Sequence, residues 1–486
     1  MSNHVIVDAF YLPNSIKLKN FQEKPIFVNG VNYQLRYPVI HKQELQEIAA
    51  AVKENRRTYL ATLPTSEIVA KIDKAIQLWL NPDYPLRQLA ESLVPAITGY
   101  DSDMVRLELK KYMRTFRKRE LLRFLDEEFD QPAILDEFRP RKSGGMSRAF
   151  GPSTIFHIFS GNVPGVQLWS LVMGLLLKSA AIGKTSLSEP LLPVLFLQSL
   201  KEVDEALAES MAVIPWKGGT VELEQAAVDW GEAVIVYGSN QTVEAIRTRT
   251  PVHKKLLSYG HKISMALIGK EALTADHFAK TLHKVAEDVS IYDQQSCLSP
   301  QVIYVEKEGA LSPKQFAQGL AGELERYHLK RPRARLTGEE AMAIQNIRNQ
   351  YHLKSLSSDK VAVYSSKEDT AWTVIYQEEP AFSGTPLNRT VHVYAIDKLE
   401  AAADLLKSYE TYLQSCSLAV EPARLFSITS LLGAVGVNRF CPIGEMNSAK
   451  PGWHHDGGFN LIELVRMVDM ERNLEYEMEK YDEDVE

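Results

Sequence analysis

One cysteine stands where covalent chemistry is easiest to perform. Cys297 lies in the stretch D-V-S-I-Y-D-Q-Q-S-C-L-S-P-Q-V-I-Y-V-E. Helical spacing of apolar residues predicts a helix over residues 274–290, and a β-branched and aromatic run predicts a strand over residues 302–305. A thiol on the connection between them can meet a substrate and, as a thiolate, attack a carbonyl carbon. A buried structural cysteine is an equal alternative, because no Lys, Arg or His within five residues could lower its pKa.

Two polar segments could add catalytic or metal-binding groups. W-H-H-D-G places His454, His455 and Asp456 in succession. Adjacent side chains converge poorly on one ion and no additional ligand is suitably spaced, so a turn packed against the site is favoured and no metal is predicted. In L-S-Y-G-H-K, His261 could act as an acid or base, but a histidine beside a turn glycine is more often structural.

The composition limits the class of protein. The 486 residues, 45% of them hydrophobic, can bury the cores of two or three domains. A net charge of -7 argues against nucleic acid as a partner. Three widely spaced cysteines indicate a reducing compartment rather than disulfides or a zinc site. No signal peptide pattern and no apolar run of the roughly 18 residues that span a bilayer is present, so we expect a cytoplasmic protein without a membrane span.

The first half of the chain should position these groups with a hairpin, a helical layer and a parallel sheet. Asn29-Gly30 between apolar residues predicts a tight hairpin. Apolar residues three and four apart then predict helices over residues 41–59, 66–80, 85–97 and 103–129. Alternating strands and helices predict a parallel sheet covered on both faces. The predicted strands are 155–159, 180–184, 211–215 and 233–237, with helices 166–178, 190–203, 221–229 and 242–248, before the apolar run 263–268.

Ligands of such sheets bind at the carboxyl ends of the strands, where the loops S-G-N-V-P-G (160–165) and Y-G-S-N (237–240) lie. The dinucleotide fingerprint G-x-G-x-x-G is missing, and glycine at such turns serves backbone geometry more often than a ligand. A second α/β region follows Cys297, with predicted helices 313–327 and 399–413 and predicted strands 361–364, 373–376 and 391–395. An amphipathic helix is predicted over residues 461–468, before an acidic tail whose end should be solvated.

Three motifs in combination resemble one family. G-N-V-P-G, Y-D-Q-Q-S-C-L-S-P-Q and W-H-H-D-G are similar to motifs of the LuxC family, acyl-CoA reductases of bacterial luminescence within the aldehyde dehydrogenase superfamily. The resemblance implies an α/β, aldehyde dehydrogenase-like fold with an N-terminal hairpin and helical layer. The implied regions are an N-terminal part of the cofactor domain (1–140), a Rossmann-like NADP(H)-binding domain (141–260), an α/β catalytic domain (261–440) and a C-terminal segment packing back near the site (441–486).

The resemblance also implies site residues, each at a matching motif position. Cys297 corresponds to the acyl-accepting cysteine and Asn162 to the asparagine whose amide stabilises the oxyanion. A helix N-terminus favours the anionic pyrophosphate of a cofactor. The implied cofactor-binding residues are Lys184 and Ser186 near the adenosine ribose, and Gly238 and Ser239 at the pyrophosphate.

Two departures from the superfamily pattern indicate reduction with NADPH. Ser258 stands where hydrolytic aldehyde dehydrogenases carry a water-activating glutamate, so water should attack the acyl-enzyme slowly. Leu187 stands where NAD-specific members often carry a glutamate that repels a 2′-phosphate, with Glu189 as the nearest acid.

The resemblance therefore implies NADPH-dependent reduction of a long-chain fatty acyl thioester to the fatty aldehyde through a Cys297 acyl-enzyme. The donor would be fatty acyl-CoA or an acylated protein, and an acyl-activating partner enzyme and a homo-oligomer are also implied. Two alternatives stay open. One is a cysteine-dependent acyltransferase without redox chemistry, and the other is a non-catalytic scaffold of the same fold, against which the intact Q-x-C and N-V-P motifs argue.

Overall fold

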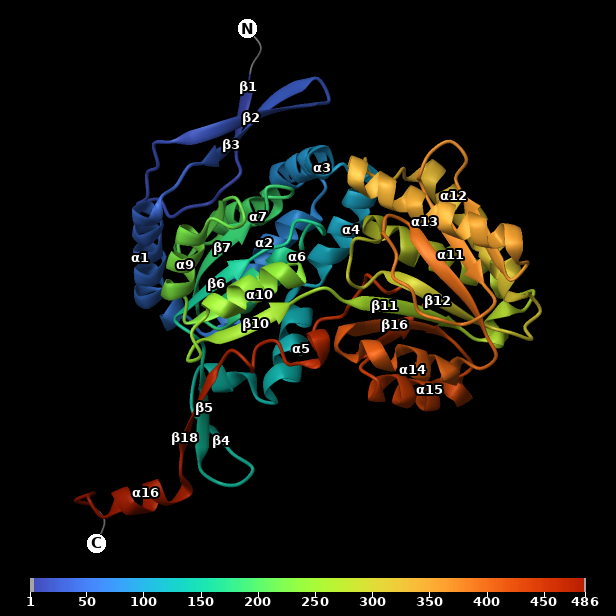
Figure 1. Cartoon of the computed structure of the whole chain (residues 1–486). Coiled ribbons are helices and arrows are strands. Elements are labelled where there is room, and N and C mark those ends of the chain that lie inside the picture. Colours follow the sequence, from blue (N-terminus) through green and yellow to red (C-terminus); the bar gives the residue numbers. More distant parts are fainter. Residues whose placement is uncertain (1–3, 485–486) are drawn as a thin grey trace.

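The chain folds into two α/β lobes with a hairpin projecting from one end and an arm from the other (Figure 1). This computed structural model describes residues 4–484. No helix in that range is long and apolar enough to cross a membrane.

The N-terminal projection is a small sheet of β1 (His4–Asp8), β2 (Phe21–Val28) and β3 (Val31–Pro38). Strands β2 and β3 pair antiparallel around Asn29-Gly30, and the two turn residues have φ of 51° and 81°. A two-residue turn of the favoured type needs positive φ at both positions. The predicted hairpin is confirmed.

The first helix of the helical layer packs on one face of the first lobe's sheet, and the others lie on the side of the opposite face. One of the predicted helices is two. The residues 103–129 form α4 and α5, because Phe116 is buried in the core and Asp73 binds the start of the second helix. Asp73 accepts from Arg117 Nε at 2.5 Å and from the Lys118 amide at 2.8 Å. The layer comprises α1 (Lys42–Thr58), α2 (Thr65–Leu80), α3 (Pro85–Thr98), α4 (Ser102–Arg114) and α5 (Lys118–Phe129).

The first lobe holds a parallel five-stranded sheet in the order β10-β9-β6-β7-β8. Its strands are short apolar runs, as expected for strands buried on both faces. Helices α2, α6 and α7 pack on one face and α1 and α9 on the other. The elements are β6 (Thr154–Ile158), α6 (Val166–Leu176), β7 (Ala180–Thr185), α7 (Leu191–Val203), α8 (Glu205–Ala208), β8 (Met211–Pro215), α9 (Val221–Trp230), β9 (Ala233–Tyr237), α10 (Asn240–Arg249) and β10 (Lys255–Tyr259).

The second lobe holds a seven-stranded sheet, β13-β14-β15-β12-β11-β16-β17, in which β13 alone is antiparallel to its neighbour. The predicted helix 399–413 is wrong in form: it breaks into a short α14 flanked by 3-10 turns, and Leu413 already begins a core strand. The elements are β11 (Ile263–Ile268), α11 (Phe278–Ser290), β12 (Pro300–Glu306), α12 (Pro313–Lys330), α13 (Gly338–Ser357), β13 (Val361–Ser365), β14 (Thr373–Gln377), β15 (Thr390–Ile396), α14 (Ala402–Leu406), β16 (Leu413–Ala419), α15 (Pro422–Ala434) and β17 (Arg439–Pro442).

The C-terminal segment returns to the first lobe, where β18 (Arg466–Met470) pairs antiparallel with β5 (Met146–Phe150) beside β4 (Arg139–Pro140). The predicted helix over residues 461–468 is wrong. The buried carboxylate of Glu128 takes the amides of Leu461 and Ile462, and the edge of β5 then pairs the following backbone. The acidic tail forms the exposed helix α16 (Arg472–Glu479) at the end of the arm (Figure 1).

Candidate active site

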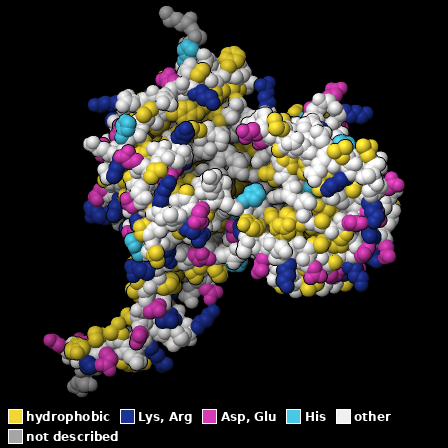
Figure 2. Space-filling model, in the orientation of Figure 1, with side chains coloured by type: hydrophobic (Ala, Val, Ile, Leu, Met, Phe, Trp, Pro, Cys, Tyr) yellow, Lys and Arg dark blue, Asp and Glu magenta, His cyan; other side chains and the backbone are white. Residues whose placement is uncertain are grey.

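The Asn162 loop of the first lobe meets the Cys297 loop of the second. Asn162 Nδ2 donates to the carbonyl oxygen of Gln295 at 2.8 Å, across 133 residues of chain. The hydroxyl of Tyr100, at the start of α4, donates to the Asn162 carbonyl at 2.6 Å. The structure thus brings the loops of the two sequence-predicted catalytic residues into contact. The space-filling view shows that the surface between the two lobes is hollowed (Figure 2).

The backbone leading to Cys297 is strained. Residues 292–294 have φ of 52°, 51° and 66°, in the left-handed region. A second run, residues 387–389, has φ of 57°, 55° and 61°. A non-glycine residue in this conformation costs roughly 1–2 kcal/mol, so surrounding contacts must hold both runs in place.

Two sets of contacts join the strained runs. Arg389 Nη2 lies 2.7 Å from Asp293 Oδ1, and this ion pair is almost completely buried. Gln294 Oε1 accepts from the Thr390 amide at 3.0 Å, and its Nε2 donates to the Pro300 carbonyl at 2.7 Å. These contacts fix where the nucleophile loop begins and ends, and so orient Cys297.

Cys297 is an exposed residue in the loop between the lobes, although protein surrounds its thiol closely enough to desolvate it. Desolvation raises the pKa of the thiol to about 12, and the nearby Asp456 carboxylate raises it further, against smaller opposing effects of Gln414 and Lys262. With no ligand bound, the thiol is therefore protonated at neutral pH. The cysteine is neither a core residue nor a preformed thiolate.

Sequence reasoning missed two residues beside the thiol. Gln414 Nε2, on β16, donates to Asp456 Oδ1 at 2.5 Å, and Lys262 Nζ lies 3.4 Å from Asp456 Oδ2. Lys262 is the last residue of the L-S-Y-G-H-K motif, so its place beside Ser258 and His261 was a signal in the sequence. Gln414 carries no motif and comes close only through the pairing of β16 with β11.

The W-H-H-D-G turn packs against this cluster. The ring of His455 stacks on Tyr259 at 4.1 Å and lies 4.6 Å from the ring of Trp453. Desolvation lowers the pKa of His455 to about 4, so the ring is neutral at pH 7. His454 instead contacts Phe459 edge to face. Within residues 4–484, no three His, Cys, Asp or Glu side chains are arranged to hold a metal ion.

Lys184 lies next to the end of β7, and its side chain is buried, with 7% of the residue exposed. Its Nζ lies 5.8 Å from the Trp216 ring, and desolvation lowers the pKa of the ammonium. No carboxylate in the described part of the chain lies within ion-pair distance of it. A buried, unpaired cation fits a polar or anionic ligand such as a nucleotide. Ser186 lies in the next turn, where its Oγ is 2.8 Å from Ser188 Oγ.

Gly238 and Ser239 lie at the end of β9, beside the point where the strand order reverses, a usual ligand position. The Gly238 amide already donates to the Tyr259 carbonyl at 3.1 Å. Ser239 caps α10 by accepting from the Thr242 amide at 3.3 Å. A pyrophosphate would therefore be met by the first turn of α10 rather than by the Gly238 amide.

Ser258 faces α10. Its hydroxyl accepts from Arg247 Nη2 at 3.1 Å, while the next residue, Tyr259, packs on the opposite side among His455 and Tyr237. His261 donates its amide to Asn240 Oδ1 at 2.9 Å, a structural contact. Ser258 has no carboxylate with which to activate water.

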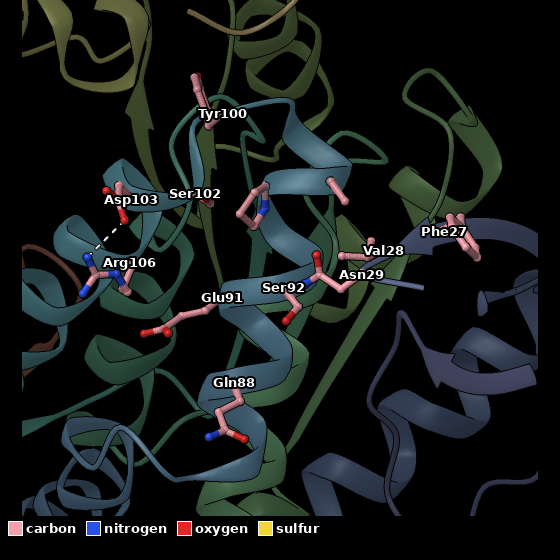
Figure 3. A pocket seen from close by; sticks show the side chains of 12 residues that line it. Phe27, Val28, Asn29, Gln88, Glu91, Ser92, Tyr100, Ser102, Asp103 and Arg106 are labelled. Carbon is pink, nitrogen blue, oxygen red and sulfur yellow. Dashed lines mark hydrogen bonds and ion pairs between the residues drawn. The ribbon is translucent and has the colours of Figure 1, made fainter. Parts of the chain in front are cut away.

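A cavity of about 850 Å³ lies between the hairpin tip and the helices α3 and α4 (Figure 3). Phe27 and Asn29 line one side, and the Asp103–Arg106 ion pair, at 3.0 Å, lies on another. Tyr100 also lines the cavity, and its hydroxyl holds the Asn162 carbonyl. The cavity and the active site therefore share one residue of the helical layer.

Comparison with known proteins gives a family and a fold. The model of the family acyl-CoA reductase (LuxC) matches residues 60–467. A long-chain acyl-protein thioester reductase of Photobacterium phosphoreum is 23% identical over 92% of this chain and 87% of its own. The Aliivibrio fischeri protein of the same name is 26% identical over 85% of this chain and 84% of its own.

Solved aldehyde dehydrogenases have the same fold, so the predicted fold class is confirmed. A salicylaldehyde dehydrogenase from Pseudomonas putida superposes with a TM-score of 0.73 at 13% identity, over 96% of this chain and 98% of the other. A putative methylmalonate-semialdehyde dehydrogenase from Sinorhizobium meliloti, complexed with NAD, gives 0.71 at 14% identity, over 97% and 98%. A Methanocaldococcus jannaschii glyceraldehyde-3-phosphate dehydrogenase, complexed with NADP, gives 0.66 at 12% identity, over 90% and 95%.

Proposed function

Since the chain belongs to the LuxC family of acyl-CoA reductases, we propose that it reduces a long-chain fatty acyl thioester to the fatty aldehyde with NADPH, through an acyl-enzyme at Cys297. The observation that carries the proposal is the contact between the lobes. In this contact the side-chain amide of Asn162 donates to the carbonyl oxygen of Gln295, which lies two residues before Cys297 in the sequence. An amide donor beside a thiol that can be acylated is the arrangement required to stabilise a tetrahedral oxyanion.

Acylation is an exchange between two thiols. Cys297 Sγ forms a bond to the thioester carbon, the bond from that carbon to the donor's sulfur breaks, and the thiol proton ends on the departing sulfur. The proton lost by Cys297 is therefore the one that the departing sulfur gains, and the exchange changes no proton count overall. In the transition state Asn162 Nδ2 would exchange the Gln295 carbonyl for the oxyanion, and losing such a donor typically costs about 3 kcal/mol of barrier.

The second step is reduction. A bound nicotinamide would supply hydride to the acyl carbon. The chain's own contribution is to hold the acyl group on Cys297, to stabilise the second oxyanion through Asn162, and to release the aldehyde when the carbon–sulfur bond breaks. Slow hydrolysis is supported by Ser258, which offers no carboxylate and whose hydroxyl is bound to Arg247.

Preference for NADPH is supported by the turn after Lys184. Leu187 is 51% exposed in place of an acid, and the nearby Glu189 is fully buried with its carboxylate bonded inward to Leu191 and Leu192. A ribose 2′-phosphate would therefore meet hydroxyl groups and Lys184 rather than a negative charge.

The family also supports an assembled enzyme supplied by an acyl-transferring partner. We propose that copies of this chain associate through the arm, which exposes Met467, Leu474 and Tyr476 and offers the unpaired edge of β18. Size-exclusion chromatography with light scattering measures the number of copies in the assembly, and deletion of residues 466–484 should reduce that number.

The decisive experiment follows one acyl group. Protein given long-chain acyl-CoA without reductant should gain one acyl mass, and Cys297→Ala should gain none. Addition of NADPH should then release the fatty aldehyde within the same preparation. Acyl loss without NADPH oxidation, or acylation of Cys297→Ala, would contradict the proposal, the first in favour of a non-redox acyltransferase.

A further inference from the structure

Gln167 closes the loop that carries Asn162. It is the second residue of α6 and is fully buried. Its Oε1 accepts from the Gly165 amide at 3.0 Å, and its Nε2 donates to the Ser160 carbonyl at 3.0 Å. One side chain therefore joins both ends of the loop 160–165, with Asn162 between them.

Glu189 holds the other side of the Gln167 amide. Glu189 Oε2 accepts from Gln167 Nε2 at 3.2 Å, and its Oε1 accepts from the amides of Leu191 and Leu192, at 3.0 and 2.9 Å, in the first turn of α7. The carboxylate is fully buried, and no Lys, Arg or His in residues 4–484 forms an ion pair with it. An unpaired buried charge is costly, so three donors and a helix N-terminus are what keep it there.

The same carboxylate belongs to the proposed cofactor turn. The backbone of Glu189 pairs with Ser186 across that turn. Gly161 packs directly on it: a Cβ at Gly161 would clash with Ser188 Oγ and lie 2.8 Å from Ser186 Oγ. The loop and the turn are thus in contact without spare room, and a shift of one must shift the other.

We propose that Glu189 is a positioning residue, which acts through Gln167 to place the Asn162 amide for the oxyanion and ties that place to the turn at Ser186. This rests on the proposed role of Asn162. The contacts run from the turn at Ser186 to Glu189, from Glu189 to Gln167, and from Gln167 to the Asn162 loop, which contacts the loop of Cys297.

The position depends on the charge of Glu189. Desolvation raises the pKa of this carboxyl to about 7, against the lowering effect of the hydrogen bonds from Leu192, Leu191 and Gln167. A proton on the carboxyl would face three N–H donors with no acceptor among them, so protonation must release at least one contact. The titratable group facing it from the neighbouring β3 is Tyr37, whose own pKa burial and Glu189 raise.

A double-mutant cycle tests the inference with the rate of Cys297 acylation by acyl-CoA in the absence of NADPH. Asn162→Ala should slow acylation about 100-fold, the usual effect of losing one oxyanion donor. Glu189→Gln should slow it about tenfold. The double variant should match Asn162→Ala within about threefold, because a residue that acts only through Asn162 has nothing left to position.

Two readouts separate positioning from a general structural role. The ratio of wild-type to Glu189→Gln rates should fall toward one as pH drops from 8 to 6, since the wild-type carboxylate is then protonated. Gln167→Met keeps the volume of the side chain and removes its three hydrogen bonds, to Gly165, Ser160 and Glu189. It should lose activity as Glu189→Gln does, and it replaces that variant if Glu189→Gln does not fold. Asp288→Asn is the matched control: Asp288 is another buried carboxyl with a pKa raised by desolvation to about 7 and two backbone donors, in the other lobe. It should leave both the acylation rate and its pH dependence unchanged.

The outcomes are distinct. No effect of Asn162→Ala would overturn the proposed oxyanion role itself. If Asn162→Ala slows acylation as expected but the double variant is slower by the product of the two single effects, the role of Asn162 stands and the role of Glu189 is overturned.

Discussion

Arg389 is the strongest single restraint on the strained loop before Cys297, so replacing it should disable the nucleophile before the lobe unfolds. Its guanidinium has no exposed surface and binds Asp293 Oδ1 through Nε at 2.8 Å and Nη2 at 2.7 Å. It also donates to the Arg331 carbonyl at 3.0 Å. Arg389→Met keeps an unbranched apolar stem and removes the charge, the hydrogen bonds and the contact of the guanidinium with the Tyr327 ring, 5.1 Å away.

The structure gives the size of the effect. After the change, the Asp293 carboxylate is 2% exposed and keeps one backbone donor, the Ala334 amide at 2.9 Å. Removing one partner of a buried ion pair costs about 3–5 kcal/mol. Left-handed conformations at Tyr292 and Gln294 already cost roughly 1–2 kcal/mol each. Because the lost interaction is as large as the stored strain, the loop should relax to a more favourable backbone and move the thiol.

Two measurements check this. Urea unfolding should show a free energy about 3–5 kcal/mol below wild type, and acylation of Cys297 should slow more than tenfold under conditions where the variant is folded. Arg424→Met is the control, since Arg424 binds Glu306 at 2.7 Å and Glu271 at 2.8 Å in the same lobe but not in the nucleophile loop. It should lose stability and acylate normally. Wild-type acylation by folded Arg389→Met would refute the account of how Cys297 is held.

Three further changes test the electrostatics. Asp456→Asn should lower the pKa of Cys297 and speed its alkylation at pH 8 several-fold, because one cause of the raised pKa is removed while burial remains; an unchanged rate would contradict it. Asp288 has a folded pKa raised to about 7 from 3.8 by desolvation, so its stabilising contribution is present below pH 4 and lost as pH rises through 7. The free energy of unfolding of Asp288→Asn should therefore rise relative to that of wild type as pH increases from 6 to 8, and a fall would contradict this. Leu187→Glu should lower the ratio of kcat/KM for NADPH to that for NADH at least tenfold, since the carboxylate would repel the 2′-phosphate; a constant ratio would place the phosphate elsewhere.

Much of the two sheets could be predicted from the sequence because their strands lie between helices on both faces. Strands such as β6 and β9 are therefore short, continuous apolar runs bounded by turn residues. Cys297 could be placed on a connection for the same reason, since α11 before it and β12 after it each have a clear pattern.

The pattern fails where a polar group takes a core position. Arg348 on α13 is 5% exposed, and its guanidinium donates to Thr373 Oγ1 at 2.8 Å and to the Asp369 carbonyl at 2.7 Å. A charged residue at a buried position removes the apolar spacing on which helix prediction depends, so α13 was not predicted. The helix predicted over residues 461–468 failed for the opposite reason: its spacing is helical, but distant partners, Glu128 and β5, take its backbone groups.

The environment of the Cys297 thiol could not be predicted either, because distant segments supply it. Residue types and motifs predicted Cys297 and Asn162 as catalytic residues, but the side chains that modify the pKa of the thiol, beyond its desolvation, come from three separate segments: Asp456, Gln414 and Lys262. Their convergence suits the proposed reaction. A protonated thiol beside a carboxylate is a poor nucleophile, so it must lose its proton to attack, but exchange with a thioester returns that proton to the departing sulfur and leaves the proton count unchanged. Water, in contrast, must lose a proton to attack, and Ser258 cannot take one. In the proposed reaction, the absence of a glutamate at position 258 would slow attack by water and would leave the acyl group on Cys297 until hydride arrives.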